Sequence, residues 1–335
     1  MVIMKNKTIL LVLVILAFGL SSAFAGNENR IGTAGAQELL IPAGSRGASM
    51  AGAVVADASG VDAIYWNPAG LATLYEGTEA MFTHLPYIAD IDVEYAAVGT
   101  AVEDFGTLGV AVKVVDVGEW EETTQDDPEG TGRFYGPTLT VVGLTYAKSL
   151  TNNINFGVTG NFIRENIFEV SATGYSFDFG FTYETRFRGL KFGFVMKNYG
   201  PDMHFEGRGF DRTAEDEQRP TSSRNANFEL PTSFNLGISY NFLQSGANSA
   251  TLAGNFRANN QANDYWQGGM EYGYDEKFFV RAGYNYSEQE GYIYGATLGL
   301  GAAIPVGGST LTLEYTWTET EVFDNNQYYT VKFAF

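Results

Sequence analysis

From about residue 76 onward, the chain is a series of long segments in which apolar residues alternate with small or polar ones. In the clearest segment, Tyr292 to Ile304, one set of alternate positions is almost wholly apolar and the other holds Gly, Ala, Thr and Ile293. The last segment ends on Tyr329, Val331, Phe333 and Phe335 with Thr, Lys and Ala between them. Successive side chains of a strand point to opposite faces. Segments of about ten residues or more with aromatic residues at their ends are typical of a transmembrane β-barrel rather than a soluble sandwich.

Alternation and turn signals predict about fourteen strands. They are expected to begin near Thr78, Asp92, Gly106, Arg133, Asn155, Ala172, Leu190, Leu230, Ala250, Tyr265, Lys277, Tyr292, Ser309 and Gln327. Every second connection is short and rich in turn formers, whereas the others include long ones at 119–132 and 200–229. Outer-membrane barrels have short turns on one side and long loops on the other. The sequence therefore predicts an all-β fold, a transmembrane antiparallel barrel over residues 76–335.

Residues 1–25 predict a signal peptide. Lys5 and Lys7 precede an apolar run over residues 8–20, and Ala23 and Ala25 are the small residues that a signal peptidase requires, so cleavage is expected before Gly26. The alternative is a membrane anchor, but the run is too short to cross about 30 Å of hydrocarbon as a helix. We expect export to the outer membrane of a diderm bacterium.

Residues 26–75 do not alternate, and they predict a plug for the barrel. The stretch 44–55 is made of small residues that suit close packing in a narrow space. Pro68 prevents a helical conformation at Asn67, and Gly70 favours a turn. We interpret this irregular segment as filling the mouth or lumen of the barrel, with a small periplasmic lid as the alternative.

Charged residues on the inward face of the strands are the candidate lumen residues. They are Asp178, Glu184, Glu271, Arg281 and Glu314. A charge facing lipid costs a few kcal/mol, whereas an inward charge is tolerated. Glu271 and Arg281 are about equally far from the turn at 275–276, so a cross-strand pair is expected. These charges either stabilise the barrel by pairing with each other or with the plug, or they line a substrate path.

Composition narrows the possible functions. Forty glycines and a 15% aromatic share suit a barrel, and the absence of cysteine excludes a disulfide framework and a thiolate metal site. Without the two lysines of the signal peptide, 18 basic residues face 39 acidic ones, which argues against nucleic acid as a partner. The two histidines, His84 and His204, are expected in separate outward loops. No hydrolase, metal-ligand or nucleotide pattern is present, so we expect no enzyme, no cofactor and no metal.

A resemblance to a known family rests on two N-terminal stretches. Residues 34–50 (AGAQELLIPAGSRGASM) together with Trp66, Asn67, Pro68, Ala69 and Gly70 resemble the N-terminal signature of the PorV/PorQ family. That family is related to the FadL-type long-chain fatty-acid transporters, which share an Asn-Pro-Ala element in the N-terminal hatch. The terminal Phe335 resembles the barrel-insertion signal. The resemblance implies a fourteen-stranded barrel plugged by its own N-terminus, in which Trp66 to Gly70 either gate the plug or only fix its position.

The resemblance implies two functions. FadL-type proteins move hydrophobic molecules inward, so the favoured expectation is passive transport of a hydrophobic small molecule by a barrel in outer-membrane lipid, gated by the plug. PorV serves type IX protein secretion, so the alternative is a secretion or envelope-assembly component that binds protein partners. The sequence does not name the ligand, and the two functions are separated by uptake and co-purification experiments.

Overall fold

The computed structural model describes residues 31–335 except 188, 208–210, 213–220, 223–225 and 290. The expected signal peptide, residues 1–25, lies outside the described residues. Within the described part, no helix is both long enough and apolar enough to cross a membrane.

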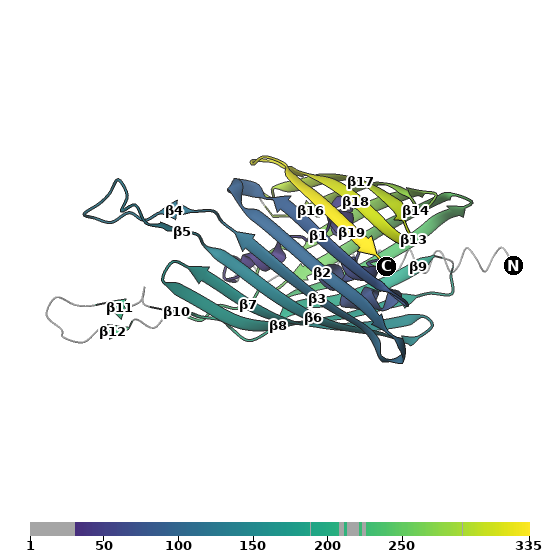
Figure 1. The fold of residues 1–335 in the computed structure, drawn as a ribbon, viewed down its shortest axis with the longest axis horizontal. Helices are drawn as coiled ribbons and strands as arrows, with labels where there is room; N and C mark the ends of the chain where they lie inside the picture. The colour runs from purple at the N-terminus through teal and green to yellow at the C-terminus, as the bar shows by residue number, and fades with distance from the viewer. Residues whose placement is uncertain (1–30, 188, 208–210, 213–220, 223–225, 290) are drawn as a thin grey trace.

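Fourteen antiparallel strands form a closed barrel (Figure 1), as the sequence predicts. Each strand pairs with its neighbours in chain order, β1 pairs with β19, and β8 pairs with β9. The strands are β1 (Thr78–Pro86), β2 (Asp92–Val102), β3 (Gly106–Asp116), β6 (Thr138–Thr151), β7 (Ile154–Ile167), β8 (Val170–Glu184), β9 (Leu190–Tyr199), β13 (Ser233–Ser245), β14 (Asn248–Asn259), β15 (Tyr265–Tyr274), β16 (Phe278–Ser287), β17 (Tyr294–Val306), β18 (Ser309–Thr320) and β19 (Asn326–Ala334).

The long connections hold further short strands that alternation did not predict. A strand was expected near Arg133, but β6 begins at Thr138 because residues 117–137 form an extension with the hairpin β4 (Trp120–Glu121) and β5 (Phe134–Tyr135). The connection from β9 to β13 holds β10 (Phe205–Gly207), β11 (Asp211–Arg212) and β12 (Thr221–Ser222). His84, expected in a loop, lies in β1.

The two faces of each strand differ in burial, as the alternation predicts. In β17, Leu298 and Leu300 are 54% and 58% exposed, whereas Thr297 of the same strand is 1% exposed. In β8, Phe177, Phe181 and Tyr183 face outward and Ser176 faces the lumen. The apolar side chains therefore cover the outside of the barrel and the small and polar ones line its interior.

The N-terminal segment lies inside the barrel (Figure 1), and residues 31–75 are called the plug from here on. It consists of helical turns: η2 (Gln37–Leu40), α2 (Ser45–Ser49), η3 (Gly60–Asp62), α3 (Ala63–Trp66) and η4 (Pro68–Thr73). Most of its residues between Ala43 and Ala72 are buried although many are Ala, Gly or Ser. Small side chains let this irregular backbone fit within a narrow lumen.

A belt of inward-facing glycines provides the space for the plug. Its members, called the glycine belt, are Gly99, Gly109, Gly157, Gly180, Gly193, Gly237, Gly269, Gly283 and Gly299. A Cβ atom at Gly180 would lie 2.0 Å from Asn67 Oδ1, and one at Gly193 would lie 2.3 Å from the Val55 carbonyl oxygen. Because glycine has no side chain, the plug backbone approaches the wall directly.

The glycine belt predicts a sharp difference between two adjacent glycines of β15. A Cβ at Gly269 would lie 2.8 Å from the carbonyl oxygen of Met50, whereas a Cβ at the outward-facing Gly268 would meet nothing within 4 Å. We expect Gly269→Ala to destabilise the protein by about 1–3 kcal/mol, the usual cost of overpacking. Gly268→Ala is the matched control and should have little effect. Thermal unfolding in detergent measures both, and equal midpoints would contradict the proposed role of the belt.

Candidate functional site

The plug separates two spaces in the lumen. The outer cavity, about 300 Å³, lies towards the end of the barrel that carries the long connections. The inner vestibule, about 740 Å³, lies at the end where β1 begins and β19 ends. Ala48, Ala51 and Gly52 line the outer cavity, and Arg46 lines the inner vestibule. The plug is therefore thin at α2 and the turn that follows it.

Charged side chains at the inner vestibule form a continuous chain that joins the plug to the wall. Arg46 of the plug contacts Glu271 (Nε to Oε2, 3.0 Å) and Asp57 (Nη2 to Oδ2, 2.8 Å). Arg281 contacts Glu271 (Nε to Oε2, 2.5 Å) and Glu314 (Nη1 to Oε1, 2.8 Å). Glu271 and Arg281 are register partners on β15 and β16. The structure thus places three of the predicted lumen residues in one network.

Two lysines extend this network, which is called the ion-pair chain. Lys332 of β19 contacts Glu314 at 2.9 Å and Asp62 of the plug at 2.6 Å, and Lys191 of β9 contacts Asp57 at 2.8 Å. Burial alone would lower the pKa of Arg46, but the carboxylates of Glu271 and Asp57 raise that pKa well above its ordinary value. The guanidinium therefore remains charged and holds α2 in place.

The other two predicted lumen residues lie elsewhere. Asp178 is buried in β8, where it accepts hydrogen bonds from the Asn198 backbone N–H at 2.7 Å and from Asn161 Nδ2 at 3.2 Å. Asn198 has a left-handed backbone (φ 57°), so this contact fixes an irregular residue of β9. Glu184 is exposed at the inner end of β8, beside Lys191 in register, and it lines neither the outer cavity nor the inner vestibule.

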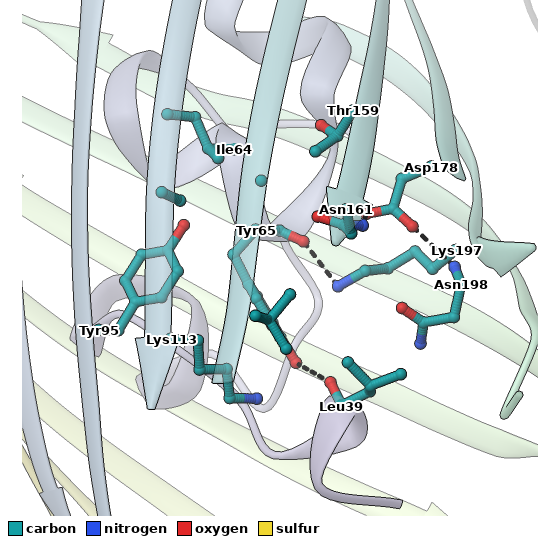
Figure 2. Close-up of a pocket in the computed structure, with 13 residues that line it drawn as sticks. Leu39, Ile64, Tyr65, Tyr95, Lys113, Thr159, Asn161, Asp178, Lys197 and Asn198 are labelled. Atoms are coloured by element: carbon teal, nitrogen blue, oxygen red, sulfur yellow. Dashed lines mark hydrogen bonds between the residues drawn. The ribbon is translucent and has the colours of Figure 1, made fainter. Parts of the chain in front are cut away.

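Tyr65 of the plug lies between a buried lysine, Lys113, and a half-buried one, Lys197 (Figure 2). The Nζ of Lys197 donates to the Tyr65 carbonyl oxygen at 2.6 Å and lies 3.5 Å from the ring centroid. The Nζ of Lys113 lies 5.4 Å from the same centroid and donates to the Ile41 carbonyl oxygen at 2.6 Å. Burial raises the pKa of Tyr65. Tyr65 and Lys197 line both the outer cavity and a small pocket of about 50 Å³, so they form the partition between these two spaces.

The outer cavity combines aromatic and polar walls. Its aromatic lining consists of Tyr65, Trp66, Tyr87, Tyr265, Tyr292, Tyr294 and Tyr328. Its polar lining includes Lys197, Asn235, Asn255, Arg257, Gln267 and Asn285, which come from five strands. Adjacent amides join across the wall, since Asn255 donates to Gln267 at 2.5 Å and Gln267 donates to Asn285 at 3.1 Å. Such a mixture of apolar surface with a few convergent polar groups is typical of small-molecule sites.

The Trp66 to Gly70 segment divides between the cavity and the wall. Trp66 lines the outer cavity. Asn67 is fully buried, where its Nδ2 donates to the Val55 carbonyl at 2.7 Å and its Oδ1 accepts from Ala69 N–H at 3.2 Å. Pro68 and Ala69 pack against the wall at Gly157, and Gly70 contacts the backbone of Ala58. The structure therefore places Trp66 at the outer cavity and the other four residues against the wall or against other parts of the plug.

Several residues of these spaces were missed from the sequence. Arg46, Asp57 and Asp62 are the three charges in the otherwise uncharged stretch 43–64, and that isolation was a usable signal. Lys332 lies on the inward face of its strand, which the alternation already indicated. Arg257 and the tyrosines of the outer cavity gave no signal, because they come together only when the barrel closes.

Solved structures share this fold. A Pseudomonas aeruginosa FadL homologue matches with a TM-score of 0.55 and 11% identity over 88% of this chain and 98% of that one. The Pseudomonas putida toluene transporter TodX matches with 0.54 and 13% identity over 86% and 95%. The Ralstonia pickettii toluene transporter TbuX matches with 0.53 and 11% identity over 87% and 97%.

The chain has the fold of FadL-type channels. Sequence identities of 11–13% establish the fold alone, and that fold is a β-barrel of the outer-membrane type. Neither a protein-family model nor a curated protein sequence matches the chain. The relationship to PorV and PorQ remains a prediction.

The ion-pair chain predicts that Arg281 is essential to stability. Its side chain is 3% exposed and contacts two buried carboxylates. We expect Arg281→Gln to destabilise the protein by about 3–5 kcal/mol, because breaking a buried pair leaves uncompensated charge. Arg133→Gln, which removes a solvent-exposed pair with Glu122, is the control and should have little effect. Denaturant unfolding in detergent compares the two, and equal losses would refute the structural role of the chain.

Proposed function

We propose that the protein is an outer-membrane channel for the passive uptake of hydrophobic small molecules, gated by its plug and without enzymatic activity. The observation that carries this proposal is the division of a closed barrel by residues 31–75 into an outer cavity and an inner vestibule. The related folds support it, since TodX and TbuX are described as toluene transporters and CymD as a monoaromatic hydrocarbon channel.

The physical logic begins with the outer surface. Its exposed leucines, phenylalanines and tyrosines are suited to lipid, and the closed sheet leaves no strand edge unpaired. A hydrophobic molecule gains about 25 cal/mol for each Å² of apolar surface that leaves water, so the aromatic wall of the outer cavity favours its capture. The concentration gradient of the ligand then drives passage once the plug shifts.

The gate is placed at α2 because the plug is thinnest there. On one side Ala48 lines the outer cavity, and two residues earlier Arg46 lines the inner vestibule. Ser45 fixes α2 to the wall, since its Oγ donates to Thr330 Oγ1 at 2.8 Å and its carbonyl accepts from Thr316 at 2.8 Å. A displacement of α2 therefore connects the two spaces.

A disulfide lock tests this gate. The chain has no cysteine, so Ser45→Cys with Thr330→Cys introduces a single possible bond between plug and wall. We expect oxidation to abolish uptake of a hydrophobic fluorescent probe by cells that produce the double variant, and a reductant to restore it. The control is Thr145→Cys with Thr159→Cys, whose hydroxyls are also 2.8 Å apart but both belong to the wall. Uptake that is insensitive to the Ser45–Thr330 lock would rule out gating by α2.

A second candidate, a secretion or assembly component, is favoured by one feature. The β4–β5 hairpin extends beyond the barrel (Figure 1), and it exposes 57% of Trp120 and 61% of Phe134. Large exposed aromatic side chains often mark protein contacts. This candidate predicts that envelope proteins co-purify in mild detergent and are lost on Trp120→Ser with Phe134→Ser. Purification without companions would count against it.

A further inference from the structure

Three buried polar atoms of the outer cavity have no hydrogen-bond partner among the described residues. They are Trp66 Nε1, Asn255 Oδ1 and Thr318 Oγ1. Asn255 and Thr318 are only 5% and 6% exposed. Buried polar atoms in proteins are almost always paired, so these three atoms favour an occupant that both accepts and donates hydrogen bonds. A pure hydrocarbon does neither.

Arg257 adds a positive charge to the lining of the outer cavity. Its Nε donates to Asn259 Oδ1 at 3.0 Å and its guanidinium carbon lies 5.8 Å from the Tyr265 ring centroid. Within the described part of the chain, no acidic side chain forms an ion pair with it, whereas Arg46 and Arg281 each contact two carboxylates. A guanidinium presents a planar pair of donors that matches a carboxylate. Lys197 is the second cation of the lining.

The aromatic wall beside Arg257 fits a ring. The centroids of Tyr265 and Tyr292 are 5.1 Å apart, and those of Tyr292 and Tyr294 are 5.8 Å apart. Aromatic pairs prefer centroid separations of about 4.5–7 Å. An apolar cavity of about 150 Å³ holds benzene, so about 300 Å³ provides room for one substituted ring.

We propose that the outer cavity binds small aromatic carboxylates, with the carboxylate at Arg257 and the ring among the tyrosines. A ring hydroxyl would supply the donor that Asn255 Oδ1 lacks, and the carboxylate would supply an acceptor for Trp66 Nε1. This inference rests on the proposed function only in taking the outer cavity as the capture site, and it narrows the ligand from any hydrophobic molecule to one with an anionic group.

Binding to the full mature protein in detergent tests the inference. The probes are 4-hydroxybenzoate, the neutral 4-hydroxybenzyl alcohol and the non-aromatic cyclohexanecarboxylate, measured by titration calorimetry. We expect 4-hydroxybenzoate to bind roughly tenfold or more tightly than either comparison, since a hydrogen bond to a charged group is about twice as strong as a neutral one. Arg257→Gln should lower the affinity for 4-hydroxybenzoate roughly tenfold or more and leave that for the alcohol unchanged.

Two further variants make the result interpretable. Arg164→Gln removes an exposed arginine of β7 that does not line the outer cavity, and its affinities should equal those of the unaltered protein. Arg257→Lys keeps the charge without the planar fork and should bind the acid with intermediate affinity. Equal affinities of the unaltered protein for the acid and the alcohol would overturn the inference even if Arg257→Gln failed to fold, as would an unchanged affinity in a folded Arg257→Gln.

The outcome is separable from that of the proposed function. Tight binding of 4-hydroxybenzoate together with uptake that ignores the disulfide lock would retain the binding site and reject the gate. Lock-sensitive uptake of a hydrocarbon probe without preference for the acid would retain the gate and reject the carboxylate site.

Discussion

The structure depends on a limit of space. A fourteen-stranded barrel can enclose a folded segment only where the inward positions of its wall have no side chain. The glycine belt meets this limit, and it does so at inward positions of nine different strands. Some of these glycines let plug backbone touch the sheet, as at Gly283 beside Met50, and others make room for a plug side chain, as at Gly109 beside Ile64. The outward positions of the same strands are unaffected by this requirement and retain large apolar residues. The alternation of the sequence therefore has two separate causes. The outward positions are large and apolar because of the surroundings of the barrel, and the inward positions are small because of the plug.

The glycine contacts make space for the plug but do little to fix its orientation. The ion-pair chain fixes that orientation. Buried ion pairs contribute little net stability because desolvation offsets their attraction, yet they are costly to break. Arg46, Asp57 and Asp62 of the plug contact three different strands of the wall, through Glu271, Lys191 and Lys332. The inner side of the plug is thereby held by ion pairs, whereas on its outer side Lys113 and Lys197 of the wall donate to plug carbonyl oxygens. In the proposed channel, the ligand would meet the side of the plug that is held by neutral acceptors and not by carboxylates.

How much the sequence could predict follows from the range of each interaction. Strand positions and faces depend on local alternation, so starts such as Leu190 and Tyr265 were predicted correctly. The extension at 117–137 displaced the start of β6 because a loop carries no period. The Glu271–Arg281 pair spans ten residues across one turn and is local in the same sense. The contact of Arg46 with Glu271 spans 225 residues and exists only after the barrel closes around the plug. The outer cavity is longer-range still, since its lining comes from the plug, from eight strands and from two connections between strands.

The charges of the two spaces also bear on how a channel releases what it binds. Conduction requires a site that is favourable enough to fill yet weak enough to empty. At the outer cavity Arg257 forms no ion pair with any residue that the structure describes, so the proposed site would attract an anionic group. At the inner vestibule Arg281 and Lys332 already contact carboxylates, so they offer an anion little additional attraction. In the proposed channel, a ligand that crossed α2 would move from a retaining site to a neutralised one, and no second anion site would oppose its release into the inner space. The paired charges of the inner vestibule hold the plug in place. Because they are paired, they offer an anionic ligand little attraction on its way out.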